Sequence, residues 1–494
     1  MSNLNKLKAD FNPRRTFKCS HSTIEVDGVF VRVAEDNDRK RSWAPVYMDE
    51  DQRDRHSHLA IDVEDILQDP AIIRSARVST GRDTKEVDEK AQGMVNFLYR
   101  DRHETPSEGS VKFRTKWTMP IMYAQPIFRL FGAHNEFSGR YSVIDGEYYT
   151  PRFEGFTDDA NLIRKEFADA ENEAQTLYKE LLEIGVAKEM ARYVHLYRFY
   201  TRFYFTVSLR HLCEFLLIDE SFKNRHSDTE FWEIKNPLIA LLQNWTPWGF
   251  EAFEKNPRPL NFKWTENFAR AEFIFDQIGN AGVNVLDHGY IELLKLDTNL
   301  RLTLAGLQDF PDPTKALNHN SMSFFVRMPI HVFRQWIRHR SLHFSELEID
   351  FDKVVESDLF YLPDRFRKQT GKVGHYTFID MDDKENEIVR RLLANHIELC
   401  KKRYTRLRNY GLSKQLAAAN LPYAFYIDTI LTTPLGGLAN FLSLRTDSHA
   451  QKEIQAYAFS IWRFWAEKDP MTAELFARYM YYGNSEEVKS FRSK

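Results

Sequence analysis

Two short stretches of the sequence carry side chains that could bind an anion. The first, Arg334–Arg340, places three guanidiniums and an imidazole within seven residues, and clustered arginines repel one another unless a phosphate or carboxylate neutralises them. The second, Ser138–Arg140, combines a hydroxyl, an unobstructed backbone N–H and a guanidinium, groups that together can form a compact phosphate site. Two plainer interpretations stay open: a solvated helix face with Trp336 and Ile337 turned inward, and a turn with an exposed arginine.

The stretch that follows Arg340 has the opposite charge. We call residues 135–141 the first elbow and residues 345–350 the second elbow. In the second elbow, Glu348 and Asp350 stand where the first has Ser138 and Arg140. Carboxylates removed from water would repel a phosphate strongly. The second elbow is therefore predicted not to bind phosphate in the same way.

Other residues of chemical interest form no recognisable metal, nucleotide or nucleophile motif. The run from His103 to Glu108 lacks a second histidine at helical spacing and a third ligand, so hydrogen bonding to a cofactor or within a turn is expected instead of metal binding. Arg445 and His449 are spaced to share one helical face and are expected in the first turn of a helix. The sequence contains no Walker loop, GxGxxG or GxSxG motif, which disfavours P-loop, Rossmann and α/β-hydrolase chemistry.

Charge and composition exclude several classes of protein. The 494 residues include 68 basic and 71 acidic side chains, so no global field would draw the chain onto nucleic acid or an anionic membrane. Cys19, Cys213 and Cys400 are far apart and in no paired motif, which argues against a disulfide framework or a zinc site. No run reaches the roughly eighteen apolar residues of a membrane span, and residues 1–15 lack the apolar centre of a signal peptide. A soluble, cytoplasmic protein without nucleic-acid or membrane partners is expected.

The elements that must position these residues follow a pattern of strands and long helices. Alternation predicts strands over 24–34 and 111–117, the latter ending at Pro120, whereas the spacing over 61–77 predicts a helix. Another helix is predicted over 158–184, with Gly185 as its C-terminal cap. The very apolar stretch 190–217 is predicted to lie in a central core.

The same order of elements recurs about 210 to 225 residues later, a period far longer than that of a solenoid repeat. Residues 283–296 repeat the opening strand pair, residues 323–329 repeat the strand ending at Pro120, and a helix over 385–410 ends at Gly411. The sequence therefore predicts an α+β fold with two tandem domains, each a small, mostly antiparallel sheet packed with long helices. The predicted parts are a flexible arm (1–20), a first domain (21–256), a linker and start of the second domain (257–280), a second domain (281–485) and a tail (486–494).

Five motifs resemble those of the flavin-dependent thymidylate synthases (the ThyX family), and the likeness covers nearly the whole chain, twice. They are Ala-Arg-Val-Ser at 76–79, His-Glu-Thr-Pro at 103–106, Asn-Glu-x-Ser-Gly-Arg-Tyr at 135–141, Arg-Gln-Trp-x-Arg-His-Arg at 334–340 and Leu-Arg-x-Asp-Ser-His-Ala-Gln at 444–451. The resemblance implies an FAD enzyme that methylates dUMP at C5 to dTMP, with methylenetetrahydrofolate as carbon donor and NADPH as hydride donor. That scheme requires no enzyme nucleophile.

The positions that match the family imply roles for individual residues. The substrate-binding set is Gln125, Glu136, Ser138, Gly139, Arg140, Arg192, Gln335 and Arg445. The FAD-binding set is Ser79, His103, Thr105, Glu108, Arg210, Arg338, His339, Arg340 and Asn440. Arg445 is also expected to be catalytic, because a cation beside the pyrimidine stabilises negative charge that develops as C5 attacks. His339 is expected to act as a positioned hydrogen-bond donor instead of a general base.

Each half of the chain departs from the family pattern where the other half keeps it. The first half has Phe128–Leu130 in place of Arg-His-Arg, the second has Glu348 and Asp350 in its elbow, and Arg192 has Ala418 as its counterpart. This implies a fused pseudo-dimer with working sites between unlike halves, and a homodimer of chains to supply the four lobes of the family's tetramer. Two alternatives remain: methylation or hydroxymethylation of another pyrimidine nucleotide, and non-catalytic nucleotide or flavin binding.

Overall fold

The computed structural model describes most of the second half of the chain and parts of the first. The described residues are 30–33, 60–67, 91–100, 110–120, 132–136, 138–140, 142–144, 146, 148–151, 159–216, 242–243, 246–256, 282–309, 313–339, 341–347, 349–372 and 375–492. They belong to two compact units. Unit 1 comprises Met1–Phe137, Glu147–Pro151 and Arg198–Lys263, and unit 2 comprises Ser138–Gly146, Arg152–Tyr197 and Trp264–Lys494.

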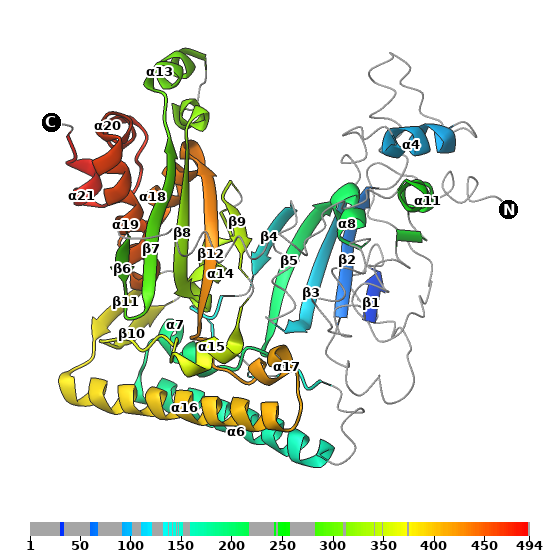
Figure 1. The fold of residues 1–494 in the computed structure, drawn as a ribbon, viewed down its shortest axis with the longest axis vertical. Helices are drawn as coiled ribbons and strands as arrows, with labels where there is room; N and C mark the ends of the chain where they lie inside the picture. Colours follow the sequence, from blue (N-terminus) through cyan, green and yellow to red (C-terminus); the bar gives the residue numbers. More distant parts are fainter. Residues whose placement is uncertain are drawn as a thin grey trace. The chain divides into compact units, whose positions relative to one another are not determined.

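Unit 1 is built on a five-stranded sheet in the order β1-β2-β3-β5-β4 (Figure 1). Its strands are β1 (Phe30–Val33), β2 (Ala60–Leu67), β3 (Ser110–Pro120), β4 (Gly132–Glu136) and β5 (Tyr200–Ser208). β1 pairs with β2 in parallel, and the other pairs are antiparallel. The strand predicted to end at Pro120 is confirmed.

The helix predicted over 61–77 is wrong where the structure describes it. Residues 60–67 form strand β2, in which Ile61 lies opposite Thr115. The register shifts between Val63 and Asp65, and such a bulge interrupts the alternation of a strand. The apolar residues therefore fall at irregular intervals and imitate helical spacing. Residues 68–77 lie outside the described part of the chain.

Three helices of unit 1 are described: α4 (Ala91–Arg100), α8 (Leu209–Leu216) and α11 (Pro247–Lys255). The ring of Tyr99 on α4 meets Phe253 of α11 edge to face, with centroids 6.0 Å apart. Asn256 donates from Nδ2 to Asn96 Oδ1 at 2.8 Å. An apolar contact and a polar contact thus join α4 to the end of α11.

Unit 2 contains a second five-stranded sheet, in the order β6-β7-β8-β12-β9, and every pair in it is antiparallel. The strands are β6 (Val283–Val285), β7 (Gly289–Asp297), β8 (Ser321–Pro329), β9 (His343–Glu346) and β12 (Tyr426–Pro434). The predicted strand pair over 283–296 and the strand over 323–329 are confirmed. In both units the fourth strand to enter the sheet lies at the edge, beside the fifth.

Helices cover one face of the unit 2 sheet (Figure 1). They include α14 (Ile330–Trp336), α18 (Leu435–Arg445) and α19 (Lys452–Lys468). Trp336 is fully buried and stacks on Phe441 of α18, with centroids 4.8 Å apart. Between β7 and β8 in the sequence come α13 (Leu300–Asp309) and η3 (Pro313–His319), and α19 is followed by α20 (Pro470–Tyr479) and α21 (Glu486–Lys489).

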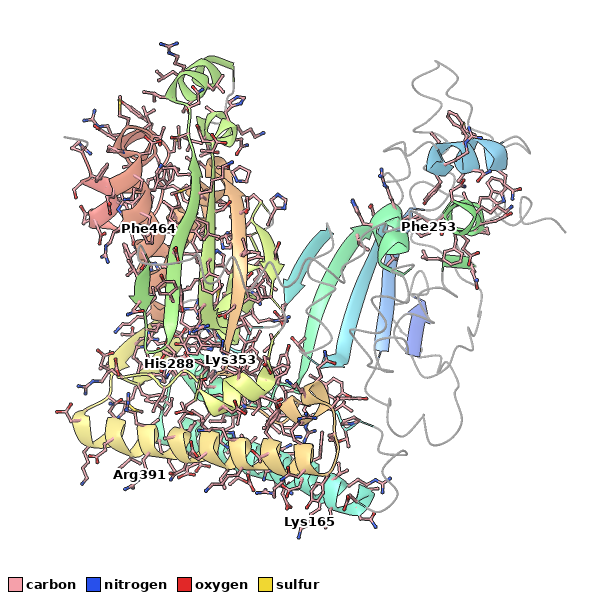
Figure 2. All side chains as sticks on the ribbon, viewed as in Figure 1. Lys165, Phe253, His288, Lys353, Arg391 and Phe464 are labelled. Carbon is pink, nitrogen blue, oxygen red and sulfur yellow. The ribbon has the colours of Figure 1, made fainter. Side chains whose placement is uncertain are left out.

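Two long helices lie side by side in unit 2, α6 (Ala160–Ile184) and α16 (Asp383–Asn409) (Figure 1). Arg403 of α16 donates to both carboxylate oxygens of Glu173 on α6, at 2.9 and 3.0 Å. Figure 2 shows Lys165 and Arg391 on the outer side of these helices, where both are exposed. Both predicted helices are confirmed, and so are their ends.

The helix ends depend on glycine in the left-handed conformation. Gly185 has φ 94° and donates its N–H to the carbonyl of Leu182. Gly411, which follows α16, has φ 86°. A side chain with a Cβ is strained at such φ values, which explains why both helices stop there.

Among the described residues, none of the helices combines the length and the apolar character needed to cross a membrane.

Short elements follow each long helix and reach the interior of unit 2. They are α7 (Lys188–Ala191) and η2 (Arg192–Val194) after α6, and α17 (Lys414–Ala418) after α16. Between β9 and α16 lie α15 (Phe351–Glu356) and the hairpin of β10 (Arg367–Lys372) with β11 (His375–Asp380). The stretch from Met190 to Tyr197 is buried throughout, as predicted, but it forms short turns of helix with buried polar side chains.

Buried histidines make unit 2 sensitive to acid. The pKa of His396 is lowered from 6.5 to about 4, mainly by burial and partly by the nearby Arg403. The ring nitrogen Nε2, 2.9 Å from the carbonyl of Val194, opposes this shift in part. Between pH 4 and 6.5 the unfolded chain binds a proton at His396 that the folded chain does not. This extra proton favours the unfolded chain. His396 therefore leaves the free energy of unfolding at its full value above pH 6.5 and lowers it as the pH falls from 6.5 toward 4.

Replacing His396 should therefore reduce the acid sensitivity of the protein. We expect the free energy of unfolding of the wild type to fall by about 1.4 kcal/mol more per pH unit over this range than that of His396→Gln, which is the value for one proton. Unfolding midpoints measured at pH 7.5 and pH 5 for both proteins would show it. His319→Gln, a change at an exposed histidine of η3, is the control. Equal acid sensitivity of wild type and His396→Gln would contradict the assignment.

Candidate functional site

Gln451 joins two of the predicted substrate-binding residues inside unit 2. Arg192, the first residue of η2, donates from Nη2 to Gln451 Oε1 at 3.1 Å. Gln335 of α14 donates from Nε2 to the same oxygen at 2.8 Å. Gln451 donates from Nε2 to the hydroxyl of Tyr193 at 2.8 Å. Residues from three distant parts of the sequence therefore meet at one amide, which lies directly before α19.

The first elbow meets the same region through Glu189. Arg140 donates from Nε to Glu189 Oε2 at 2.8 Å and from Nη2 to the carbonyl of His449 at 3.2 Å. Arg192 donates from its Nε to the backbone carbonyl of Glu189 at 3.1 Å. The Glu189 side chain is fully buried, so a charge partner is needed to hold its carboxylate there. One residue of α7 thus orients both arginines.

The backbone of the first elbow is compact around Gly139. The N–H of Arg140 donates to Ser138 Oγ at 3.3 Å, which closes a tight turn. A Cβ built on Gly139 would lie 2.8 Å from Ile144 Cδ1 and 3.5 Å from Arg192 Cδ. A larger residue at this position would push Ile144 away. Glycine therefore permits the elbow to approach Arg192 closely.

Two tyrosines and a second buried carboxylate complete this cluster. Tyr193 and Tyr361 donate their hydroxyls to Glu453 Oε1 at 3.1 and 3.2 Å. Burial, together with the Glu453 carboxylate, raises the pKa of both tyrosines well above 10. Both hydroxyls therefore keep their protons and remain donors. The ring of His331 packs against Tyr193 with centroids 4.3 Å apart and an interplanar angle of 32°.

His339 and Arg445, the two predicted catalytic residues, are in direct contact. Arg445 donates from Nε to His339 Nε2 at 3.0 Å. The pKa of His339 is lowered to about 3, mainly by burial and partly by the cations of Arg445 and Arg338. Because Nε2 accepts a hydrogen bond in a neutral ring, the proton must be on Nδ1. His339 is thus a neutral imidazole that can donate a hydrogen bond from Nδ1.

The local setting of Arg445 differs from the sequence prediction. Arg445 is the last residue of α18, and α19 begins at Lys452, so the arginine does not lie in the first turn of a helix. His449 lies in the intervening turn, where Asp447 Oδ1 is 2.7 Å from its Nδ1. The prediction failed because the polar residues 446–451 form a turn between two helices. The carbonyl that His449 offers to Arg140 belongs to this turn.

The second elbow also forms a salt bridge, but here the residue of the elbow is acidic and its partner is basic. Asp350 is exposed, and its Oδ1 lies 2.9 Å from Lys414 Nζ at the start of α17. The same ammonium is 2.8 Å from Asp352 Oδ2. The first elbow therefore presents an arginine to a glutamate of α7, whereas the second presents an aspartate to a lysine of α17.

Other predicted positions lie outside the cluster around Gln451. Glu136 of β4 accepts a hydrogen bond from Thr201 Oγ1 at 2.7 Å, and Arg210 is buried in α8, both in unit 1. Arg338 is half-buried beside His339, and Asn440 accepts from the hydroxyl of Tyr482. Seven residues of interest lie outside the described part of the chain: Ser79, His103, Thr105, Glu108, Gln125, Arg340 and Glu348.

Several residues of the cluster were not among those selected from the sequence, and they include Gln451, Glu189, Glu453 and Arg367, whose Nη2 lies 3.1 Å from Glu189 Oε1. Gln451 stands at the end of the motif at 444–451, so the motif itself was a signal for it. Glu189 lies three residues before Arg192, a spacing that places two helical residues on one face. Glu453 and Arg367 carry no local signal, because their partners are more than eighty residues away in the sequence.

Comparisons with known proteins agree with these observations. The sequence profile of the Thy1 family, described as "Thymidylate synthase complementing protein", matches residues 63–248 and 311–471. The chain is 37% identical over 166 residues to a flavin-dependent thymidylate synthase of Thermosipho melanesiensis, covering 34% of this chain and 72% of that protein. For the enzyme of the same name from Thermotoga neapolitana, the identity is 35% over 204 residues, covering 40% and 90%.

The solved structures to which this chain is similar include a UMP/dUMP methylase, PolB from Streptomyces cacaoi, bound with 5-Br UMP. The alignment has a TM-score of 0.34 and 27% identity, and it covers 39% of this chain and 96% of that chain. A second structure of the same methylase, bound with 5-Br dUMP, aligns with a TM-score of 0.35 and 24% identity.

Proposed function

The chain belongs to the Thy1 family, and on this premise we propose that it is a flavin-dependent thymidylate synthase. It methylates dUMP at C5 to give dTMP, with methylenetetrahydrofolate as the carbon donor and NADPH as the hydride donor. The observation that best supports this assignment in the chain itself is the convergence of Arg140, Arg192 and Gln335 around Glu189 and Gln451. Such a cluster of cations and amide donors suits a nucleotide monophosphate.

In this proposal the first elbow binds the phosphate of dUMP. The backbone N–H of Gly139, the Ser138 hydroxyl and the guanidiniums of Arg140 and Arg192 are donors of the kind that recognise a phosphate dianion. Gln335 orients Arg192 through their shared partner Gln451. Glu136 and Gln125 belong to the same substrate-binding set by their positions in the family motifs.

The residues around His339 fit a flavin. A neutral imidazole with a proton on Nδ1 suits a hydrogen bond to a flavin ring, and the adjacent Arg338 suits its diphosphate. The remaining FAD-binding positions in the proposal are Ser79, His103, Thr105, Glu108, Arg210, Arg340 and Asn440. When bound, FAD supplies hydride-transfer chemistry. Because His339 has a pKa of about 3, it holds a proton in place and does not accept one at neutral pH.

Arg445 is proposed to hold the pyrimidine of dUMP. Its guanidinium is fixed in position by the hydrogen bond to His339. The pyrimidine reacts through C5 as an enolate-like nucleophile, whose negative charge lies partly on the ring carbonyls until C5 attacks the carbon donor, and a preorganised cation stabilises that charge. The chain itself therefore contributes binding, orientation and electrostatic stabilisation, and it needs no covalent nucleophile.

We further propose that the chain arose by tandem duplication, with domains at 21–256 and 281–485 that have divided the work. The two sheets share one strand order, and the family profile matches the chain in two segments, which supports this proposal. The first half keeps the elbow that suits phosphate, and the second keeps Arg338–Arg340. Two chains in a homodimer would supply four lobes.

An assay of the purified protein tests the proposed function. We expect bound yellow flavin, formation of dTMP from dUMP when NADPH and methylenetetrahydrofolate are supplied, and a dimer of full-length chains by light scattering. Omission of the folate should abolish dTMP formation while NADPH oxidation remains possible. Absence of flavin would overturn the assignment of this chain as an enzyme. Turnover of another pyrimidine nucleotide, without formation of dTMP, would show that the substrate is that nucleotide and not dUMP.

A further inference from the structure

The β10–β11 hairpin connects α7 with the first elbow. The N–H of Ala187 donates to the carbonyl of Arg367 at 2.7 Å, and the N–H of Lys188 donates to Gln369 Oε1 at 3.0 Å. Gln369 donates from Nε2 to the carbonyl of Arg140 at 3.5 Å. Val186 and Lys368 form an antiparallel bridge beside them. The hairpin is therefore docked on the segment that orients the two phosphate-site arginines.

Arg367 brings a buried positive charge to this contact. It is only 4% exposed, and its Nη2 lies 3.1 Å from Glu189 Oε1 and 3.5 Å from Glu453 Oε2. Burial alone would lower the pKa of Arg367, but the carboxylates of Glu453 and Glu189 raise it above its usual value. Arg367 is therefore a cation at any working pH. Its guanidinium also lies over the ring of Phe378 on β11, 5.7 Å from the centroid.

Among the described residues of this cluster, positive charges outnumber negative ones. Three guanidiniums, those of Arg140, Arg192 and Arg367, meet two carboxylates, those of Glu189 and Glu453, and four of these five groups lie near enough to Tyr193 to shift its pKa. The surplus is one positive charge in a region shielded from water, where it attracts an anion more strongly than it would at the surface. Removing Arg367 would abolish the surplus and leave Arg140 to neutralise Glu189.

We propose that Arg367 is a positioning residue for the substrate phosphate: by neutralising Glu189 and Glu453, it leaves Arg140 and Arg192 able to bind a phosphate dianion. This inference rests on the proposed function, because it takes the ligand of the first elbow to be a nucleotide monophosphate. It assigns to a hairpin of the second half an electrostatic role at the elbow of the first half.

Titration calorimetry with dUMP and with deoxyuridine, which lacks the phosphate, tests the role of Arg367. In Arg367→Met, which keeps the length of the side chain but not its charge, we expect the Kd for dUMP to rise at least about tenfold, and the Kd for deoxyuridine to stay unchanged. Arg367→Lys should recover most of the dUMP affinity. Arg365→Met is the matched control, since Arg365 is half-exposed and pairs with Asp383 at 2.7 Å.

A second variant covers the case in which Arg367→Met does not fold. The double variant Arg367→Met/Glu189→Gln removes one buried charge of each sign and restores the positive surplus. If Arg367→Met folds, the double variant should bind dUMP more tightly than Arg367→Met does. If Arg367→Met is unfolded, the Kd of the double variant for dUMP should lie within about tenfold of the wild-type value. Loss of dUMP binding by the folded double variant would overturn the inference.

Three further results would decide against the role of Arg367. An unchanged Kd for dUMP in folded Arg367→Met would overturn this inference alone and leave the proposed function intact. Equal losses of affinity for dUMP and deoxyuridine would show a merely structural role for Arg367. A wild-type protein that binds flavin but no dUMP would overturn the assigned substrate together with this inference.

Discussion

Arg140→Ala should raise the Kd for dUMP by roughly tenfold to a hundredfold. A charge-assisted hydrogen bond to a phosphate contributes about 1.5–3 kcal/mol, and each 1.4 kcal/mol is a factor of ten. The substitution has a second consequence, because Glu189 loses a cation 2.8 Å from its carboxylate. Arg192 and Arg367 would then face Glu189 and Glu453 without a surplus of positive charge, so the measured loss should lie toward the upper end of this range.

The matched control for Arg140→Ala is the corresponding change in the other elbow, Asp350→Ala. Asp350 is exposed and paired with Lys414, and an exposed ion pair contributes only about 0–1 kcal/mol to stability. We expect its Kd for dUMP to equal that of wild type in the same calorimetric titration. If both substitutions weakened dUMP binding equally, the assignment of the phosphate to the first elbow would be wrong.

Trp336→Ala should lower the free energy of unfolding by about 3–5 kcal/mol, the usual cost of removing a large buried aromatic side chain. Trp336 is fully buried, stacks on Phe441 with an interplanar angle of 7° and meets Tyr457 of α19 with centroids 5.9 Å apart. One side chain thus holds α14 against two other helices. Because α14 leads directly into His339, flavin retention should fall as well.

The control for Trp336→Ala is Tyr479→Ala. Tyr479 is 67% exposed at the end of α20, so its removal should change the free energy of unfolding by no more than about 0.5 kcal/mol. Chemical denaturation of both variants, followed by far-UV circular dichroism, measures the difference. A Trp336→Ala protein as stable as Tyr479→Ala would show that the stacked pair does not anchor α14.

Local signals in the sequence predicted the elements well. Gly185 and Gly411 end their helices because each adopts a positive φ. A single glycine in the sequence is enough to indicate such an end. The strand β2 was misread because its register with β3 shifts between Val63 and Asp65, and the pairing partner lies far away in the sequence. Periodicity reports on one segment only, so a distortion imposed by a neighbouring strand is invisible to it.

The candidate site shows the same division between local and distant information. Ser138, Arg140, Arg192 and Gln335 could be selected from motifs, and the structure brings Arg140, Arg192 and Gln335 into one hydrogen-bonded cluster. Arg367 could not be selected, since neither its neighbours nor its spacing distinguish it from the other arginines. Its importance comes only from the two buried carboxylates it meets, Glu189 and Glu453.

The opposite polarity of the two elbow salt bridges bears on how the halves can evolve. Recombination that copied residues 348–350 over 138–140 would place an aspartate beside Glu189, and the reverse exchange would place an arginine beside Lys414. Each hybrid would bring like charges together, at a cost that is larger where the site is buried. Under the proposed duplication the halves would therefore not be interchangeable, and selection against such hybrids would keep their elbows distinct.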